Sequence, residues 1–282
     1  MVSPVVLVTG CTKGGIGYEL CKKFSQEGCR VFATARNVDN MSGLEEYGCE
    51  KLALDVTKAD SINQCVEKVL EAAGRIDILV NNAGTPAIGA LLDIDFDTIR
   101  QCIETNVFGL LSISRIVGRH MAEKQKSGKI VNFGSVVGYS STPWAGIYSL
   151  SKAAVHSLSD TLRMELKPFG VHVTVVAPGA ITSNIGNAST NTINIPDNSL
   201  YKSVTKFIFA RANLSQGPSS TPTAVFASKV VKKILRPTPP RYITEGTNSL
   251  TFLLFYYLPF FIKDYILSRK LGVNQIKLVK DN

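Results

Sequence analysis

Tyr148 and Lys152 stand four residues apart, and Ser135 precedes the tyrosine by thirteen residues. On a helix, positions four apart share one face, so the phenol and the ammonium would point the same way. The serine closely follows the apolar, strand-like run Lys129–Phe133. Together these side chains offer a phenol that can give a proton, a cation that lowers its pKa, and a hydroxyl that can hold a carbonyl oxygen. The spacing occurs often by chance, so its weight depends on the elements that position it.

Apolar runs alternate with helical segments along most of the chain. We expect strands at Val5–Thr9, Cys29–Ala35, Lys51–Val56, Ile76–Val80, Lys129–Phe133 and Val171–Val176. We expect helices at Ile16–Gln26, Met41–Tyr47, Ser61–Ala73, Thr98–Met121, around Tyr148, and at Ala224–Leu235. Continuous apolar strands separated by helices predict a parallel sheet covered on both faces. The predicted fold class is therefore α/β, a Rossmann-type doubly wound sheet in a single domain.

The remaining segments divide the chain into a domain, a lid and a tail. Residues 185–222 are polar and rich in Asn, Ser, Thr and Pro, with a short helix expected near Tyr201–Arg211. We interpret residues 184–222 as a lid over the site. Residues 1–248 would form the domain that includes this lid, and residues 249–282 a hydrophobic and basic tail.

The turn after the first strand is rich in glycine and reads Thr9-Gly-Cys-Thr-Lys-Gly-Gly-Ile-Gly17. Glycines let backbone amides approach a pyrophosphate closely, and the N-terminus of the following helix attracts negative charge. The turn therefore predicts a dinucleotide site. Its candidate binding residues are Gly10, Thr12, Lys13, Gly14, Gly15, Ile16 and Gly17.

The ends of the next strands indicate which dinucleotide binds. Arg36 follows the second strand, where a site for NAD usually has an acidic residue that holds the ribose 2′-hydroxyl. Arg36 and Lys13 would instead attract a 2′-phosphate, which favours NADP(H). Further candidates are Asp55 and Val56, beside the adenine, and Asn82, Ala83 and Gly84, beside the nucleotide.

Composition argues against other classes of function. The net charge is +9, but Lys and Arg are scattered through the first two thirds, unlike the clustered basic face of a nucleic-acid-binding protein. The six cysteines show no metal-ligand spacing, so we expect no metal and reduced thiols. The run Val5–Val8 leads directly into the glycine turn and is too short for the apolar core of a secretory signal. We therefore expect a protein that lies inside the cell or faces the cytosol.

These motifs, in this order, resemble the short-chain dehydrogenase/reductase family over about residues 5–185. The turn departs from the family's usual TGxxxGxG because four residues separate Gly10 from Gly15, and we expect the loop to absorb the extra one. Where the family often has PGxxxT, Ser183 stands at the position of the threonine with Thr182 beside it, and the resemblance implies that either hydroxyl could contact the nicotinamide carboxamide. The matching positions are the glycine turn, Asp55, the segment Asn81-Asn-Ala-Gly84, Asn106, Ser135, Tyr148, Lys152 and Pro178-Gly179.

The resemblance implies a role for each matching residue. Tyr148 would be the general acid in carbonyl reduction, and Ser135 would hold the substrate carbonyl. Lys152 would lower the pKa of the phenol and bind the nicotinamide ribose, while Asn106 would position a water in a proton relay to Lys152. We interpret His156, one turn after the lysine, as packing. At the nicotinamide end the implied contacts are Pro178, Gly179, Ile181 and Ser183.

The run Leu250–Ile262 carries no charge and is rich in aromatic residues. As a helix it would reach about 20 Å, short of the ~30 Å hydrocarbon core of a bilayer, and Pro259 would interrupt it. We therefore do not expect a single spanning helix. We interpret the run as an element that dips into one leaflet of a membrane or into a lipid droplet, flanked by basic residues. A helix that packs on the domain or across a dimer interface is the alternative.

The glycine turn, the segment Asn106–Gly109 and the hydrophobic tail resemble the fungal 1-acyldihydroxyacetone-phosphate reductases within the family. This implies NADPH-dependent reduction of 1-acyldihydroxyacetone phosphate to 1-acylglycerol 3-phosphate, on the cytosolic face of the endoplasmic reticulum and on lipid droplets. Lys202, Lys206 or Arg211 could then meet the phosphate of the substrate.

Other hypotheses about the function stay open. Retinol and 17β-hydroxysteroid dehydrogenases resemble the chain nearly as well. A non-catalytic nucleotide-binding membrane or lipid-droplet protein is the alternative from another class. Related enzymes commonly dimerise through their long helices, so a homodimer is compatible with the resemblance.

Overall fold

The computed structural model describes residues 3–184, 189–190 and 192–277. Within them, seven strands form a parallel sheet in the order β3-β2-β1-β4-β5-β6-β7. The order reverses between β1 and β4, as in doubly wound sheets, so the predicted fold class is confirmed. The strands are β1 (Val5–Thr9), β2 (Arg30–Ala35), β3 (Glu50–Ala53), β4 (Ile78–Asn81), β5 (Gly128–Phe133), β6 (Val171–Pro178) and β7 (Tyr242–Glu245).

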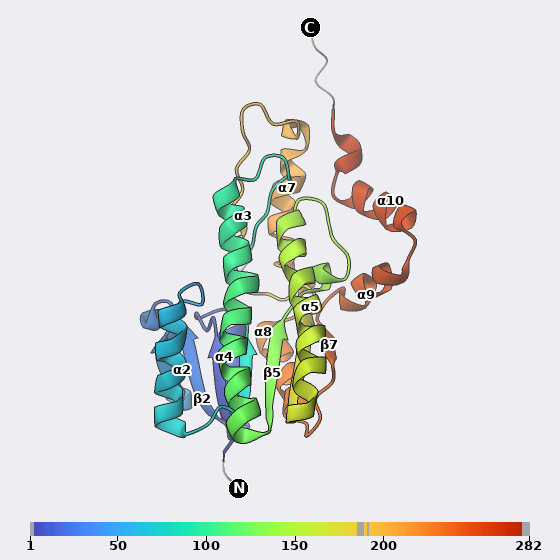
Figure 1. Cartoon of the computed structure of the whole chain (residues 1–282). Coiled ribbons are helices and arrows are strands. Elements are labelled where there is room, and N and C mark those ends of the chain that lie inside the picture. The colour runs from blue at the N-terminus through green and yellow to red at the C-terminus, as the bar shows by residue number, and fades with distance from the viewer. Residues whose placement is uncertain (1–2, 185–188, 191, 278–282) are drawn as a thin grey trace.

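Helices cover both faces of this sheet (Figure 1). One face carries α1 (Ile16–Gln26) and α8 (Thr223–Ile234). The other carries α2 (Ala59–Ala73), α4 (Leu110–His120) and α5 (Gly146–Leu166).

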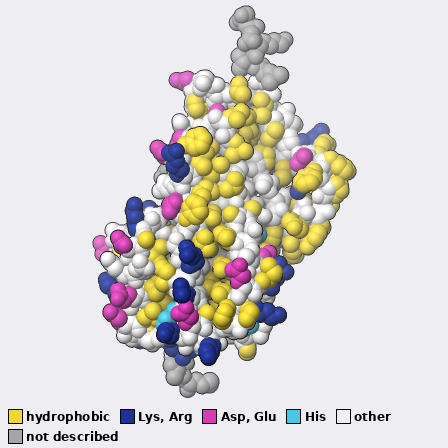
Figure 2. All heavy atoms as spheres, viewed as in Figure 1, with side chains coloured by type: hydrophobic (Ala, Val, Ile, Leu, Met, Phe, Trp, Pro, Cys, Tyr) yellow, Lys and Arg dark blue, Asp and Glu magenta, His cyan; other side chains and the backbone are white. Residues whose placement is uncertain are grey.

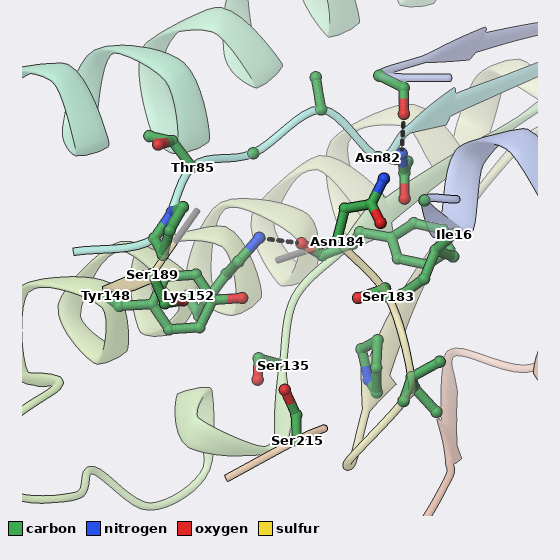
Figure 3. Close-up of a pocket in the computed structure, with 18 of the residues that line it drawn as sticks. Ile16, Asn82, Thr85, Ser135, Tyr148, Lys152, Ser183, Asn184, Ser189 and Ser215 are labelled. Carbon is green, nitrogen blue, oxygen red and sulfur yellow. Dashed lines mark hydrogen bonds between the residues drawn. The ribbon is translucent and has the colours of Figure 1, made fainter. Parts of the chain in front are cut away.

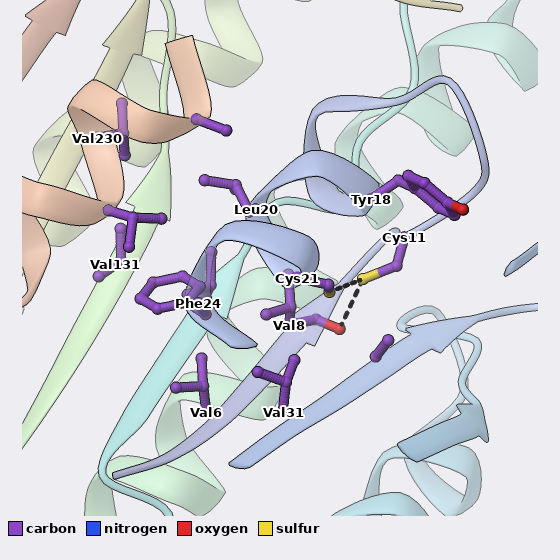
Figure 4. Packing of buried hydrophobic residues seen from close by; sticks show 14 of the residues in the cluster. Val6, Val8, Cys11, Tyr18, Leu20, Cys21, Phe24, Val31, Val131 and Val230 are labelled. Carbon is purple, nitrogen blue, oxygen red and sulfur yellow. Dashed lines mark hydrogen bonds between the residues drawn. The ribbon is translucent and has the colours of Figure 1, made fainter. Parts of the chain in front are cut away.

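The central strand β1 explains why both faces need cover. Val6 and Val8 pack against Phe24 of α1 in one buried cluster (Figure 4). Val5 and Leu7, which alternate with them, belong to the cluster on the opposite face. Successive strand residues point to opposite faces, so a continuous apolar run requires two cores.

The helix expected at Thr98–Met121 is interrupted. α3 (Phe96–Ile103) passes into a wide π-helical turn, Glu104–Gly109, before α4 begins, and a second such turn, Met121–Gln125, follows α4. A π turn holds an extra residue and frequently marks a functional site. Here it carries Asn106, whose side chain is buried.

Two other regions differ from expectation. The strand predicted at Lys51–Val56 ends early, and the helix predicted at Met41–Tyr47 is replaced by 3₁₀ turns. β7 was not predicted, because the strand has only four residues and only one of them is buried. The 3₁₀ turns are Val38–Met41, Glu45–Tyr47, Val136–Gly138, Lys167–Phe169, Lys202–Val204 and Val273–Gln275.

The segments interpreted as a lid and a tail meet through a third buried cluster. α7 (Thr205–Ala212) packs with the tail helices α9 (Ser249–Tyr257) and α10 (Phe260–Lys270) around Trp144. The indole Nε1 of Trp144 donates a hydrogen bond of 2.7 Å to the carbonyl oxygen of Leu271.

One face of the tail therefore packs on the domain, as the alternative interpretation of this run proposed. Pro259 lies between the two tail helices and is the N-cap of α10. Among the described residues, no helix combines the length and hydropathy needed to cross a bilayer.

Candidate active site

A cavity of about 690 Å³ lies at the carboxyl ends of the strands, the usual ligand position in a doubly wound sheet. It collects most of the predicted site residues (Figure 3). Those that line it are Gly10, Thr12, Gly15, Ile16, Arg36, Asp55, Val56, Asn82, Ala83, Gly84, Ser135, Tyr148, Lys152, Pro178, Gly179, Ile181 and Ser183. The predicted residues outside its lining are Lys13, Gly14, Gly17 and Asn106.

The glycine turn is shaped by close backbone contacts. Gly10 has a φ of +74°, and a Cβ there would lie 2.7 Å from the Cα of Ala83. The N–H of Gly15 donates to the carbonyl of Thr12 at 3.0 Å, so a tight turn absorbs the extra residue. Gly15 is also the N-cap of α1, which brings the positive end of that helix to the cavity.

The other two glycines of the turn permit packing behind the cavity. A Cβ on Gly17 would lie 2.5 Å from the carbonyl oxygen of Gly10. Gly14, with a φ of +81°, is covered by the amide of Asn184, whose Nδ2 donates to the carbonyl of Lys13 at 2.6 Å. Gly17 thus lets the backbone of Gly10 pack closely, and Gly14 does the same for the side chain of Asn184, although neither glycine lines the cavity.

Arg36 and Asp55 line the cavity beside the ends of β2 and β3. Burial opposes ionisation of Asp55, but hydrogen bonds from the N–H and hydroxyl of Thr57, together with the charge of Arg36, lower its pKa. Arg36 is exposed and can bind a phosphate. Lys13 is exposed outside the lining, so its contact with a 2′-phosphate stays a prediction.

These features fit a phosphorylated dinucleotide. The turn leaves no room for side chains where a pyrophosphate would approach the N-terminus of α1. At the end of β2, a guanidinium takes the position of the acidic residue that would repel a 2′-phosphate. Ser183, whose N–H donates to Gln216 Oε1 at 3.0 Å, lines the cavity, whereas the neighbouring Thr182 does not.

Ser135, Tyr148 and Lys152 converge at the opposite end of the cavity (Figure 3). Tyr148 and Lys152 come from the start of α5, and Ser135 caps the 3₁₀ turn that follows β5. The hydroxyl of Ser135 accepts a hydrogen bond of 3.3 Å from the N–H of Val137. Lys152 Nζ donates to the carbonyl of Phe133 at 2.8 Å and lies 5.6 Å from the centre of the Tyr148 ring.

Burial sets the protonation of this group. It raises the pKa of Tyr148 to about 12, against smaller lowering effects of Arg211 and Ser135. It also lowers the pKa of Lys152 to about 8. In the protein alone, burial outweighs the groups that lower the pKa of Tyr148, and the lowering expected from Lys152 together with the oxidised nicotinamide stays a prediction. The phenol keeps its proton at neutral pH and is suited to act as an acid.

His156 supports the loop that carries Ser135. Its Nε2 accepts a hydrogen bond of 3.4 Å from the backbone N–H of Ser135. Its ring occupies the space that a Cβ on Gly134 or Gly138 would need. Burial, helped by the charge of Lys152, lowers the pKa of His156 to about 4. The imidazole is therefore a neutral packing group, as predicted.

Asn106 links three segments below the cavity. Its Oδ1 accepts from the N–H of Thr85 at 2.8 Å, and its Nδ2 donates to the carbonyl of Thr85 and to Ser151 Oγ, both at 3.0 Å. The amide thereby ties the segment after β4 to α5. Its role in a water relay stays a prediction.

Several lining residues come from segments that the sequence motifs do not reach. Arg211, in the last turn of α7, was not distinguished from its basic neighbours by any pattern. Phe252 of α9 belongs to the run interpreted as a membrane element, and it lines the cavity. Asn184, Ser189 and Leu214 also line it.

Comparison with known proteins identifies the family. Residues 4–194 match the family model for short chain dehydrogenases. The NADPH-dependent 1-acyldihydroxyacetone phosphate reductase of Schizosaccharomyces pombe is 38% identical over 212 residues, covering 74% of this chain and 71% of that protein. The reductase of the same name from Saccharomyces cerevisiae is 30% identical over 283 residues, covering 96% and 92%. The chain therefore belongs to the short chain dehydrogenase family, and the protein is an oxidoreductase.

A solved structure agrees with this assignment. The short-chain dehydrogenase from Streptomyces avermitilis superposes with a TM-score of 0.79 at 28% identity, over 98% of each chain.

Proposed function

We propose that the protein uses NADPH to reduce the ketone of 1-acyldihydroxyacetone phosphate to 1-acylglycerol 3-phosphate. The observation that carries this proposal is the convergence of Ser135, Tyr148 and Lys152 in a cavity whose other end holds the glycine turn and Arg36. The arrangement supports ketone reduction at a nicotinamide. The choice of substrate is supported by the two yeast reductases of this name.

NADPH, when bound, supplies a hydride for the carbonyl carbon. The residues of this chain hold the carbonyl and deliver a proton to its oxygen. Tyr148 donates that proton: its phenol is protonated at neutral pH, and the positive charge of Lys152 would favour the phenolate that remains. The hydroxyl of Ser135 donates a hydrogen bond to the same oxygen, and the ammonium of Lys152 places positive charge beside it.

The walls of the cavity suit a lipid. Phe252 of α9, Leu214 of the lid and Ile88 after β4 line it with apolar surface. An acyl chain that enters from the tail side would replace water on these side chains, which favours binding.

The substrate assignment is tested by supplying purified protein and NADPH with 1-palmitoyl-dihydroxyacetone phosphate, retinal and a 17-ketosteroid. We expect turnover of the first at least tenfold above the others. Preference for retinal or the steroid would identify a retinoid or steroid oxidoreductase instead. NADPH binding without turnover of any ketone would favour the non-catalytic alternative.

We also propose that the tail holds the protein on the cytosolic face of the endoplasmic reticulum membrane and on lipid droplets. Figure 2 shows apolar side chains gathered on the lobe that α9 and α10 form. Phe260 and Phe261 are 76% and 73% exposed, and Lys263, close to the ring of Phe260, could meet lipid headgroups.

Deletion of the tail would uncover the buried cluster around Trp144, so point variants are the better test. We expect Phe260→Ser with Phe261→Ser to abolish flotation with phosphatidylcholine–phosphatidylserine vesicles. Phe96→Ser, at a residue 71% exposed on α3, is the matched control and should float like the wild type. Flotation of the double variant would contradict this anchor.

A homodimer is a further proposal. Phe108 of the π turn and Leu150 of α5 are exposed on elements that contact one another. Pairing this face with a second copy would bury both. Light scattering should give the mass of a dimer for the wild type and of a monomer for Leu150→Glu; a monomeric wild type would exclude the dimer.

A further inference from the structure

Arg211 is a cation that faces the cavity without a carboxylate partner among the residues that the structure describes. It lines the cavity from the last turn of α7 and is half-buried. Its Nε donates a hydrogen bond of 3.1 Å to Thr142 Oγ1. The ion pairs among the described residues all involve other cations. A guanidinium has five N–H donors and stays charged, so most of its binding capacity is unused by the protein.

The charge of Arg211 lies near the catalytic phenol. Tyr148 opposes the lowering of the Arg211 pKa that burial causes, and Arg211 in turn lowers the pKa of Tyr148. Both side chains line the same cavity. The guanidinium is thus placed at the substrate end, apart from Arg36 and the glycine turn at the cofactor end.

A structural role for this cation accounts for only part of the observations. A positive charge in the last turn of a helix is favourable wherever it points. Lys206, on the same helix, is exposed and lies 5.1 Å from the ring of Phe207, outside the lining of the cavity. Lys202 lies 4.0 Å from Asp197. Of these basic residues, Arg211 alone combines a place in the cavity wall with the absence of a carboxylate partner in the described structure.

We propose that Arg211 binds an anionic group of the ketone substrate, so that the protein selects ketones that carry a phosphate or a carboxylate close to the carbonyl. Partial burial of an uncompensated guanidinium costs free energy, and an anion within reach of its planar fork offsets that cost. The inference rests on the proposed function, and it names the residue that binds the anionic end of the substrate.

Binding tests this inference independently of turnover. Protein saturated with NADP⁺ is titrated in a calorimeter with 1-acylglycerol 3-phosphate and with its dephosphorylated counterpart, 1-acylglycerol. We expect the wild type and Lys206→Gln to prefer the phosphorylated lipid at least tenfold. Arg211→Gln should lose that preference, Arg211→Lys should keep part of it, and the affinity for NADP⁺ should not change. A wild type without preference, or a preference that survives in Arg211→Gln, would overturn the inference.

Turnover separates anion binding from an effect on the acid. Arg211→Gln should lower kcat/KM for 1-palmitoyl-dihydroxyacetone phosphate by roughly 30-fold, the size of a lost charge-assisted hydrogen bond. It should change kcat/KM for dephosphorylated 1-palmitoyl-dihydroxyacetone by less than about threefold. Equal losses on both ketones would mean that Arg211 acts through Tyr148, and the inference would fall.

The two proposals fail differently. Preference for the phosphorylated lipid through Arg211, without reduction of either ketone, would remove the proposed reaction and leave the anion site. Equal reduction of both ketones by the wild type and by Arg211→Gln would keep the proposed reaction and remove the anion site.

Discussion

The two ends of the cavity are formed by different parts of the chain. The cofactor end consists mainly of backbone, from the glycine turn after β1 and the N-terminus of α1, together with the side chains of Arg36 and Asp55 beside the ends of β2 and β3. The substrate end adds side chains from α7 and α9, such as Arg211 and Phe252, which lie beyond residues 4–194 of the family match. Parallel strands fix the first end, whereas the packing of the lid and tail around Trp144 fixes the second.

This division separates chemistry from choice of substrate. Ser135, Tyr148 and Lys152 lie at the substrate end, but β5 and α5 position them rather than the lid or the tail. A change in the lid or tail should therefore alter which ketone is reduced without altering how. A change at the cofactor end should alter which dinucleotide is used.

Replacing the acid should give the largest effect. We expect Tyr148→Phe to lower kcat by about 10³-fold, because general acid catalysis contributes roughly 10² to 10⁴. The affinity for NADPH, measured by fluorescence titration, should change less than twofold, since the glycine turn and Arg36 are untouched. A parallel loss of NADPH binding would show that the two ends are not independent.

Acid should weaken the support of the catalytic loop. Burial and Lys152 lower the pKa of His156 to about 4 from its ordinary 6.5. Between these values the unfolded chain binds more protons than the native one, so stability falls as pH falls from about 6.5 to about 4, by up to about 3 kcal/mol.

Urea unfolding at pH 7 and pH 5 measures this loss. In His156→Gln the amide oxygen can still accept the N–H of Ser135, but nothing titrates at this position. The variant should therefore lose less stability between the two pH values than the wild type. An identical loss in both proteins would place the acid sensitivity elsewhere.

Removing the guanidinium at the end of β2 should change the choice of dinucleotide. We expect Arg36→Gln to raise KM for NADPH by about 30-fold and KM for NADH by less than threefold, because only the former carries the 2′-phosphate. Lys13→Gln is the informative comparison and should have a smaller effect, since Lys13 does not line the cavity. Equal effects on both dinucleotides would count against phosphate recognition by Arg36.

The sequence predicted the cofactor end far better than the substrate end. Strand periodicity and glycine spacing are local signals, so the sheet, the turn and the positions of Asp55 and Asn82 could be read in order. The π turn at Asn106 could not be predicted from the sequence, because a helical pattern does not reveal one inserted residue. β7 was missed because its partner β6 lies more than sixty residues earlier and its own pattern is weak.

The substrate end depends on contacts between segments far apart in the chain. Nothing in residues 201–211 distinguishes Arg211 from Lys206, because only the packing of α7 decides which cation faces the cavity. The tail pattern indicated apolar character correctly. It could not indicate that Phe255 is buried and Phe260 exposed, or that Phe252 lines the cavity.

Phe252 gives the smallest and most specific effect. It is half-buried in the cavity wall, so Phe252→Ala removes apolar surface that an acyl chain would cover. We expect kcat/KM to fall about tenfold for a palmitoyl substrate and less than twofold for its butyryl analogue, because only the longer chain reaches this wall. Phe260→Ala, in the same tail but outside the lining, is the matched control and should leave both values unchanged. Equal losses for the two chain lengths would mean that α9 shapes the catalytic group itself, and the separation of chemistry from substrate choice would fail at this helix.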